Sequence, residues 1–213
     1  MNINKKELNK IKNFYSDIKD DIAARLTEFS GIWKTDSDEG LFGEMVFCLL
    51  TPQSRARSCW RAVKNLKDKD MLFRGPPEKI TPLLKGVRFK NNKTKYIIMA
   101  RKQYPKIKNK ITSHRDSLKL RSWLAENVCG LGYKESSHFL RNIGLGEDVA
   151  ILDRHILKNL KLLGVIRSVP ANISKKKYFQ IEGKMKKFSA SCGIPLDCLD
   201  LLLWAREAGE IFK

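Results

Sequence analysis

The stretch that decides the fold is Val128-Cys129-Gly130-Leu131-Gly132-Tyr133-Lys134. Two glycines flank Leu131 between segments of helical length, and glycine permits backbone angles that residues with a Cβ resist. Such a turn also lets backbone N–H groups approach an anion at the start of the next helix. The pattern predicts two helices joined by a hairpin that grips a phosphate backbone, with Gly130 and Gly132 at the contact. A G-x-G alone is equally consistent with a tight structural turn.

Two ionisable residues close to the hairpin indicate covalent chemistry on a sugar. Lys134 lies in the first turn of the second helix, where the helix dipole favours acids, and a lysine amine can attack a sugar carbon. A lysine that only contacts phosphate is the alternative. Asp153 precedes a helix with an apolar stripe, so it can cap that helix and also stabilise positive charge that develops at C1′. These two roles of Asp153 are compatible.

The charge of the chain favours a polyanionic partner. It has 213 residues, with 42 lysines and arginines against 23 acids and a formal net charge of +19. Nucleic acid is the commonest polyanion in cells, and a merely soluble basic protein is the alternative. The sequence has neither a run of eighteen apolar residues nor a signal peptide, so we expect no membrane partner and a cytoplasmic protein that works with the chromosome.

The distribution of cysteine and histidine gives no reason to expect a catalytic metal or a redox cofactor. The five cysteines include no C-x-x-C pair, which argues against a disulfide framework or a zinc site. The three histidines are too scattered to form a ligand set. These residues are Cys48, Cys59, Cys129, Cys192, Cys198, His114, His138 and His155.

Hydrophobic periodicity predicts an all-α protein. Ser54 is expected to cap a helix that directs Trp60, Val63 and Leu66 to the core. The other helices are expected over residues 6–29, 42–50, 92–104, 116–127, 134–143, 153–163, 174–191 and 195–208. We expect one unit over residues 1–213 with two helical subdomains, approximately 36–128 and 1–35 plus 129–213, and the active site in the cleft between them.

Four segments in order resemble the helix-hairpin-helix DNA glycosylase superfamily. The hairpin with Lys134 is followed by Ile151-Leu152-Asp153-Arg154-His155, and both match the catalytic segment. Leu49-Leu50-Thr51-Pro52-Gln53-Ser54 resembles the segment whose glutamine enters the base stack. Residues 86–97 resemble the loop and helix that meet the opposite strand, which implies that Arg88 and Phe89 contact the orphaned cytosine.

The end of the chain narrows the resemblance to one branch. Residues 197–213 are similar to the tail of the compact archaeal-type 8-oxoguanine DNA glycosylase/lyase family. The resemblance implies that Lys213 reaches the lesion pocket and that Asp200 and Trp204 help to build it. The last two are four residues apart and share a helix face. Tryptophan can stack on a flipped purine, and aspartate can accept from its Watson–Crick N–H groups.

The resemblance implies a bifunctional enzyme acting as a monomer on duplex DNA that contains an oxidised guanine. Lys134 attacks C1′ with the assistance of Asp153, a Schiff base forms, and β-elimination cuts the strand 3′ to the lesion. The four-cysteine iron–sulfur cluster of other branches is absent, because only Cys192 and Cys198 lie near the C-terminus. The superfamily hairpin also implies a monovalent cation on backbone carbonyls near Cys129, Gly130 or Leu131.

Two other functions remain open at this point. One is a glycosylase for another lesion, such as an oxidised pyrimidine or a deaminated base. The other is a non-catalytic helix-hairpin-helix DNA-binding module, which explains neither Asp153 nor the tail with Trp204.

Overall fold

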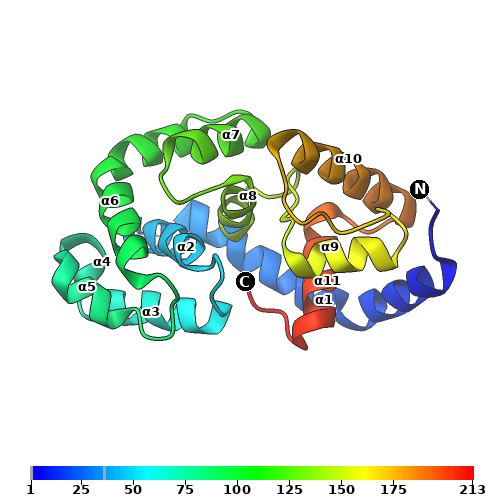
Figure 1. Ribbon diagram of the computed structural model, residues 1–213, viewed down its shortest axis with the longest axis horizontal. Helices are drawn as coiled ribbons and strands as arrows, with labels where there is room; N and C mark the ends of the chain where they lie inside the picture. Colours follow the sequence, from blue (N-terminus) through cyan, green and yellow to red (C-terminus); the bar gives the residue numbers. More distant parts are fainter. Residues whose placement is uncertain (1, 36) are drawn as a thin grey trace.

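The computed structural model describes residues 2–35 and 37–213, and within them every regular element is a helix (Figure 1). The prediction of an all-α fold is confirmed. No single helix of this part of the chain is long and apolar enough to span a membrane; only the bent pair of helices Lys175–Cys192 and Leu196–Ala208 passes by length and composition. The helices are α1 (Lys5–Thr35), α2 (Asp38–Leu50), α3 (Ala56–Asp68), α4 (Met71–Arg74), α5 (Pro77–Leu83), α6 (Lys90–Thr112), α7 (Ser117–Asn127), α8 (Tyr133–Asn142), α9 (Arg154–Leu162), α10 (Lys175–Cys192) and α11 (Leu196–Ala208).

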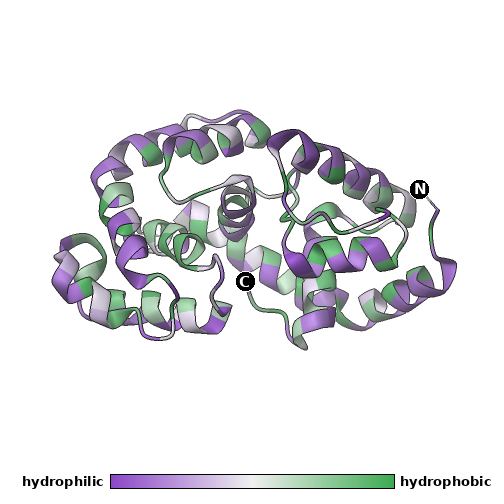
Figure 2. Ribbon diagram, in the orientation of Figure 1, coloured by the Kyte–Doolittle hydropathy of each residue, from purple (hydrophilic) through white to green (hydrophobic). Residues whose placement is uncertain are grey.

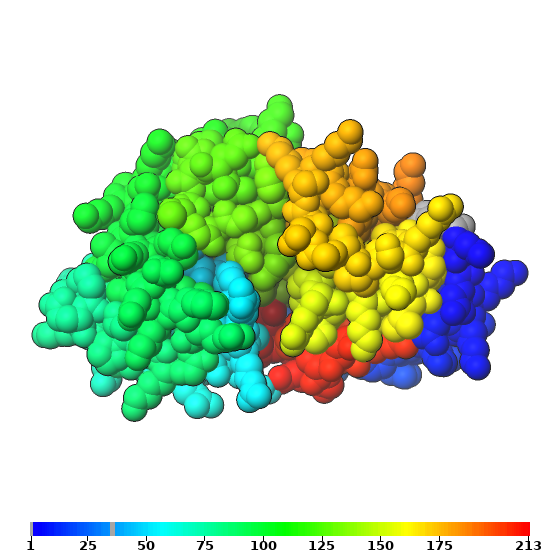
Figure 3. Space-filling model, in the orientation of Figure 1, coloured from blue at the N-terminus to red at the C-terminus, as the bar shows by residue number. Residues whose placement is uncertain are grey.

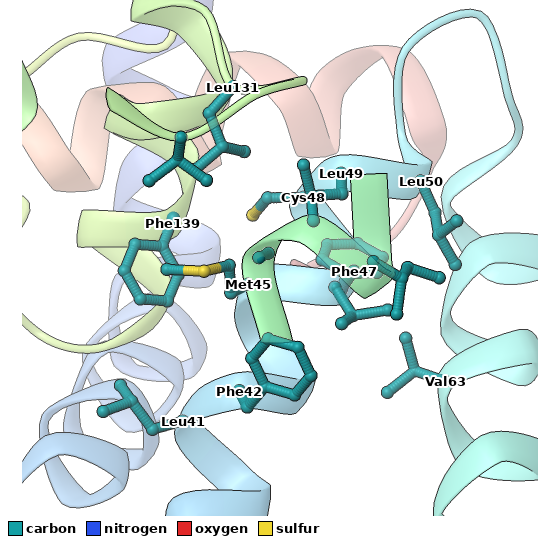
Figure 4. Close-up of a cluster of buried hydrophobic side chains, with 14 of the residues drawn as sticks. Leu41, Phe42, Met45, Phe47, Cys48, Leu49, Leu50, Val63, Leu131 and Phe139 are labelled. Atoms are coloured by element: carbon teal, nitrogen blue, oxygen red, sulfur yellow. The ribbon is translucent and has the colours of Figure 1, made fainter. Parts of the chain in front are cut away.

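Two clusters of buried apolar side chains hold the helices together. The first cluster gathers α2 to α8 around α2, in which every residue from Gly40 to Leu50 is buried (Figure 4). Most of the α2 ribbon has the colour of hydrophobic residues (Figure 2). The second cluster gathers α9 to α11 on α1, and Ile32 near the end of α1 packs against both clusters. The predicted subdomain boundaries stay a prediction, and residue 36 lies outside the described residues.

Most predicted helices occur, with differences at their ends. α1 continues to Thr35 rather than ending at residue 29, and α6 begins at Lys90 rather than Asn92. The prediction that Ser54 caps α3 is wrong. Arg55 is the N-cap residue, and its side chain has no acceptor with which to cap the helix. The Ser54 hydroxyl instead contacts residues far along the chain, Arg88 and Lys93.

The last residues pass from the second cluster to the first. α11 ends at Ala208, and its C-cap residue is Gly209, whose φ of 76° suits glycine. The chain then turns toward α2. The Phe212 ring packs edge-on against Phe47, with 6.4 Å between the ring centroids. In Figure 3 the red C-terminal atoms lie at the bottom of a depression between cyan residues near 50 and yellow residues near 155. The residues after α11 therefore connect the second cluster to the first.

Candidate active site

A cavity of about 1060 Å³ is lined by residues on helices from both clusters, among them α3 and α8 of the first and α9 and α11 of the second. Such a volume accommodates a ligand of the size of a nucleotide. Most of the residues predicted from sequence line it, although they come from six different parts of the chain. They are Gln53, Arg88, Lys134, Asp153, Asp200, Trp204 and Lys213.

Lys134 extends from the first turn of α8 into this cavity. Its Nζ lies 3.1 Å from Oε1 of Glu135, and the Lys134 side chain is 25% exposed. The other oxygen of Glu135 accepts a hydrogen bond from the backbone N–H of Gly132, at 3.2 Å. Glu135 therefore connects the hairpin to the lysine. The sequence contained a signal for it, an acid three residues after the N-cap position.

The hairpin glycines do not line the cavity, and Gly130 has a packing reason to be glycine. Its φ is 93°, and a Cβ there would lie 2.7 Å from the Tyr96 ring and 3.0 Å from the Leu49 side chain. The hairpin thus lies directly against α2 and α6. Contact of Gly130 and Gly132 with DNA stays a prediction.

Asp153 is the N-cap residue of α9, as predicted. Its Oδ1 accepts from the backbone N–H groups of His155 and Ile156, each at 2.8 Å. The cap uses one carboxylate oxygen and leaves Oδ2 for other partners. Capping and a second role at the cavity are therefore structurally compatible.

Asp200 lies at the bottom of the cavity and is 4% exposed. Burial raises the pKa of its carboxyl group to about 7, while the guanidinium of Arg141, 3.8 Å away, favours the ionised form. Trp204 follows one turn later on α11 and is half-buried. Near neutral pH the group is therefore divided between its acid and carboxylate forms.

The ammonium of Lys213 is enclosed by the first cluster rather than open to the cavity. It forms an ion pair with Oε1 of Glu44 on α2 and lies 3.9 Å from the centroid of the Trp60 ring. The Lys213 side chain is only 9% exposed, whereas the residue as a whole is half-buried. Burial lowers the pKa of this lysine, and Glu44 opposes that shift. The accessible part of Lys213 is therefore mainly its main chain.

Gln53, Arg88 and Phe89 lie at the rim, on two loops. Gln53 and Phe89 both adopt left-handed backbone angles, with φ of 55° and 57°. Phe89 is 55% exposed and lies outside the cavity lining, with the Arg88 guanidinium 5.7 Å from its ring centroid. An exposed aromatic ring on a strained backbone at a cleft is a common feature of binding sites.

Sequence reasoning missed four residues that shape the site: Glu44, Glu135, His138 and Arg141. Burial keeps the pKa of His138 well below its ordinary value, so this histidine is neutral. Glu44 was detectable, because an acid within a helix that is apolar nearly all round must find a buried partner.

Comparison with known proteins gives one consistent result. A family model described as 8-oxoguanine DNA glycosylase matches residues 22–194. The chain is 43% identical to an "8-oxoguanine DNA glycosylase/AP lyase" of Fusobacterium nucleatum over 210 residues, which covers 96% of this chain and 97% of that protein. It is 37% identical to the protein of the same name from Methanocaldococcus jannaschii over 210 residues, which covers 98% of each chain.

Two solved structures are similar over nearly their whole length. The Methanocaldococcus jannaschii 8-oxoguanine glycosylase/lyase in complex with 15mer DNA containing 8-oxoguanine superposes with a TM-score of 0.89 at 35% identity, covering 97% of this chain and 99% of that one. The 8-oxoguanine DNA glycosylase of Thermotoga maritima superposes with a TM-score of 0.88 at 33% identity, covering 97% and 98%.

Proposed function

Because the chain belongs to the 8-oxoguanine DNA glycosylase family, we propose that its cavity excises 8-oxoguanine through Lys134 and Asp153. Membership of the family carries the helix-hairpin-helix glycosylase fold and the combined DNA glycosylase and AP lyase activity. The observation that supports the assignment of residues is the cavity itself. It gathers Lys134 and Asp153 with Asp200, Trp204 and Lys213.

The damaged base must leave the duplex before chemistry can occur, at a cost of a few kcal/mol. Gln53 would fill the space that the base leaves, and Arg88 and Phe89 would contact the opposite strand. The extruded base would stack on Trp204, with Asp200 accepting from its Watson–Crick N–H groups. These hydrogen bonds would be stronger inside the cavity than in water, because the protein around the base has a lower dielectric constant.

The reaction would begin with attack of the Lys134 amine on C1′. For this the lysine must lose a proton and leave Glu135, which holds its Nζ at 3.1 Å in the free protein. The C1′–Nζ bond forms while the glycosidic bond breaks, and the base departs with its electron pair and takes up a proton. The carboxylate of Asp153 would stabilise the positive charge that develops at C1′.

Strand cleavage would follow from the same covalent linkage. Opening of the sugar ring converts the C1′ amine into a Schiff base, which acidifies the C2′ proton. Loss of that proton and rupture of the C3′–oxygen bond cut the strand 3′ to the lesion. Water then hydrolyses the Schiff base and releases Lys134. Asp153, which lines the same cavity, would assist these proton transfers.

The environment of Lys213 suggests how the two ends of this residue divide their work. Glu44 and Trp60 surround the ammonium, so the main-chain oxygens of Lys213 are the part left for a base. 8-Oxoguanine carries a donor at N7 where guanine has an acceptor. An oxygen acceptor from Lys213 would therefore favour the oxidised base.

Three features of the proposal concern the surroundings of the enzyme. A monovalent cation would bind the hairpin, where the carbonyls of Cys129, Gly130 and Leu131 accept none of the hydrogen bonds recorded for the described residues. The cation would order the part of the backbone that faces phosphate. It would take no part in the reaction. The protein would act as a monomer on chromosomal DNA in the cytoplasm.

Borohydride trapping tests the proposed function. The protein is mixed with a duplex that carries 8-oxoguanine opposite cytosine, beside undamaged, uracil and thymine-glycol duplexes. We expect a covalent band with the 8-oxoguanine strand that disappears in Lys134→Gln and remains in Lys19→Gln, an exposed lysine of α1. A band confined to another lesion would overturn the substrate assignment. Bound DNA with no band would favour a non-catalytic module.

A further inference from the structure

One buried lysine has no role in the chemistry described above. Lys93, in the first turn of α6, is 3% exposed. Its Nζ donates to the carbonyl oxygens of Leu50 and Pro52, at 2.6 and 2.7 Å, and to the hydroxyl of Ser54, at 2.9 Å. An ammonium has three protons to donate, and all three are used. Its contacts are oxygens of one short loop and include no carboxylate.

That loop carries Gln53. The carbonyls of Leu50 and Pro52 lie at the C-terminal end of α2, where the helix dipole and unpaired carbonyls favour a positive charge. Between them and Ser54 lies Gln53, whose φ of 55° is unfavourable for a residue with a Cβ. Strained backbone of this kind persists only when the surroundings hold it. The ammonium of Lys93 contacts the loop on both sides of the strained residue.

The same lysine also contacts the loop that carries Arg88 and Phe89. Its backbone N–H makes the first intrahelical hydrogen bond of α6, to the carbonyl of Phe89 at 3.0 Å, a bond that does not depend on the side chain at this position. The Ser54 hydroxyl, which accepts from Lys93, also accepts from the backbone N–H of Arg88 at 3.0 Å. Phe89 has a left-handed φ of 57°. Two of the three non-glycine residues with positive φ in the described chain therefore adjoin Lys93.

We propose that Lys93 is a positioning residue that holds the Gln53 loop and the Arg88–Phe89 loop at a fixed separation, so that both enter the duplex together. The inference rests on the proposed function, because it assigns both loops to DNA. Lys93 itself would touch neither base nor sugar. Its action would be confined to extrusion of the base, before Lys134 reacts.

Packing alone does not account for a lysine at this place. Position 93 faces inward with Ile97 and Ala100, and an apolar side chain is the usual occupant of such a face. A buried ammonium is costly to desolvate, and replacing buried charge by a well-packed apolar residue is often neutral or stabilising. Such a cost is expected at sites where geometry matters more than stability.

Single-turnover kinetics on two duplexes test this role. One duplex carries 8-oxoguanine opposite cytosine, and the other carries a preformed abasic site, where no base has to leave the stack. The variants are Lys93→Met, which keeps the length of the side chain, and Ser54→Ala, which removes the shared hydroxyl. Lys102→Met, an exposed lysine farther along α6, is the matched control for the loss of charge.

We expect the maximal rate of 8-oxoguanine excision to fall about tenfold or more in Lys93→Met, as for loss of hydrogen bonds to a buried charge. The maximal rate of excision should also fall in Ser54→Ala, by a smaller factor. The enzyme concentration at half-maximal rate, the cleavage of the abasic duplex and both rates of Lys102→Met should change little.

Two results would overturn the inference. If excision and abasic cleavage fell together in both variants, Lys93 would only support the folded structure. If excision were unchanged in both variants, Lys93 would have no positioning role. Should Lys93→Met fail to fold, the ratio of the two rates in Ser54→Ala decides alone. Absence of excision and of a trapped band in the unsubstituted protein would instead refute the proposed function.

Discussion

Replacement of Glu44 by glutamine should separate recognition of the base from cleavage of the strand. Glu44 is 2% exposed, pairs with the ammonium of Lys213 through Oε1, and accepts from Asn142 Nδ2 through Oε2 at 3.0 Å. Glu44→Gln keeps the volume and the acceptor for Asn142 but removes the negative charge. The ammonium would then remain beside Trp60 with no anion.

The size of the effect follows from the burial of the pair. Loss of one partner of a buried ion pair costs about 3–5 kcal/mol, because the other charge stays desolvated. Residues 210–213 can escape this cost by leaving the first cluster, where the Arg57–Glu210 pair is exposed and contributes about 0–1 kcal/mol. The ratio of docked to undocked tail should thus fall by about 10² to 5 × 10³. The unfolding midpoint should change little, because detachment limits the loss.

The assay compares 8-oxoguanine excision with cleavage of a preformed abasic site. We expect excision to fall to nearly the rate of a chain that lacks Lys213, while abasic cleavage through Lys134 is retained. Adding Lys213→Met to Glu44→Gln places an apolar side chain between the aromatic rings and should restore docking and much of the excision. Excision at the original rate in Glu44→Gln, or an equal loss of both activities, would refute the reasoning.

Three further predictions concern Asp200, Glu182 and the hairpin. The pKa of Asp200 is raised to about 7 by burial, and the carboxylate can accept through both oxygens whereas the acid form turns one of them into a donor. Excision at limiting DNA should therefore fall as pH drops below 7, and a matching pH profile in Asp200→Asn would contradict this role. Glu182→Gln breaks a buried ion pair with Arg121 and should lower the free energy of unfolding, measured by urea denaturation, by about 3–5 kcal/mol. An unchanged urea midpoint would show that this ion pair does not stabilise the fold. Potassium should raise the melting temperature above that in tetramethylammonium if the hairpin binds a monovalent cation, and equal values would remove that site.

Local features of the sequence were sufficient to predict most of the helices and to place Lys134 and Asp153 at the beginning of two of them. Lys134 follows its glycines directly, and Asp153 begins its helix, so the pattern of neighbours located both. The resemblance supplied Asp200 and Trp204, which the structure places in the same cavity.

Local sequence patterns could not predict contacts between distant segments of the chain. Ser54 has the local pattern of an N-cap, yet its hydroxyl contacts Lys93 and Arg88, 39 and 34 residues away. Periodicity assigned residues to a face but gave no information on which buried charges would meet. The pairing of Glu44 with Lys213, 169 residues apart, is the clearest example.

The position of Lys213 has a practical consequence for anyone who produces this protein. Its side chain is 9% exposed and the residue lines the cavity, so residues appended after it would begin inside the proposed site of the base. A purification handle at that end would act as a built-in competitor, and preparations carrying one would understate the activity. Handles belong before Lys5, where α1 begins.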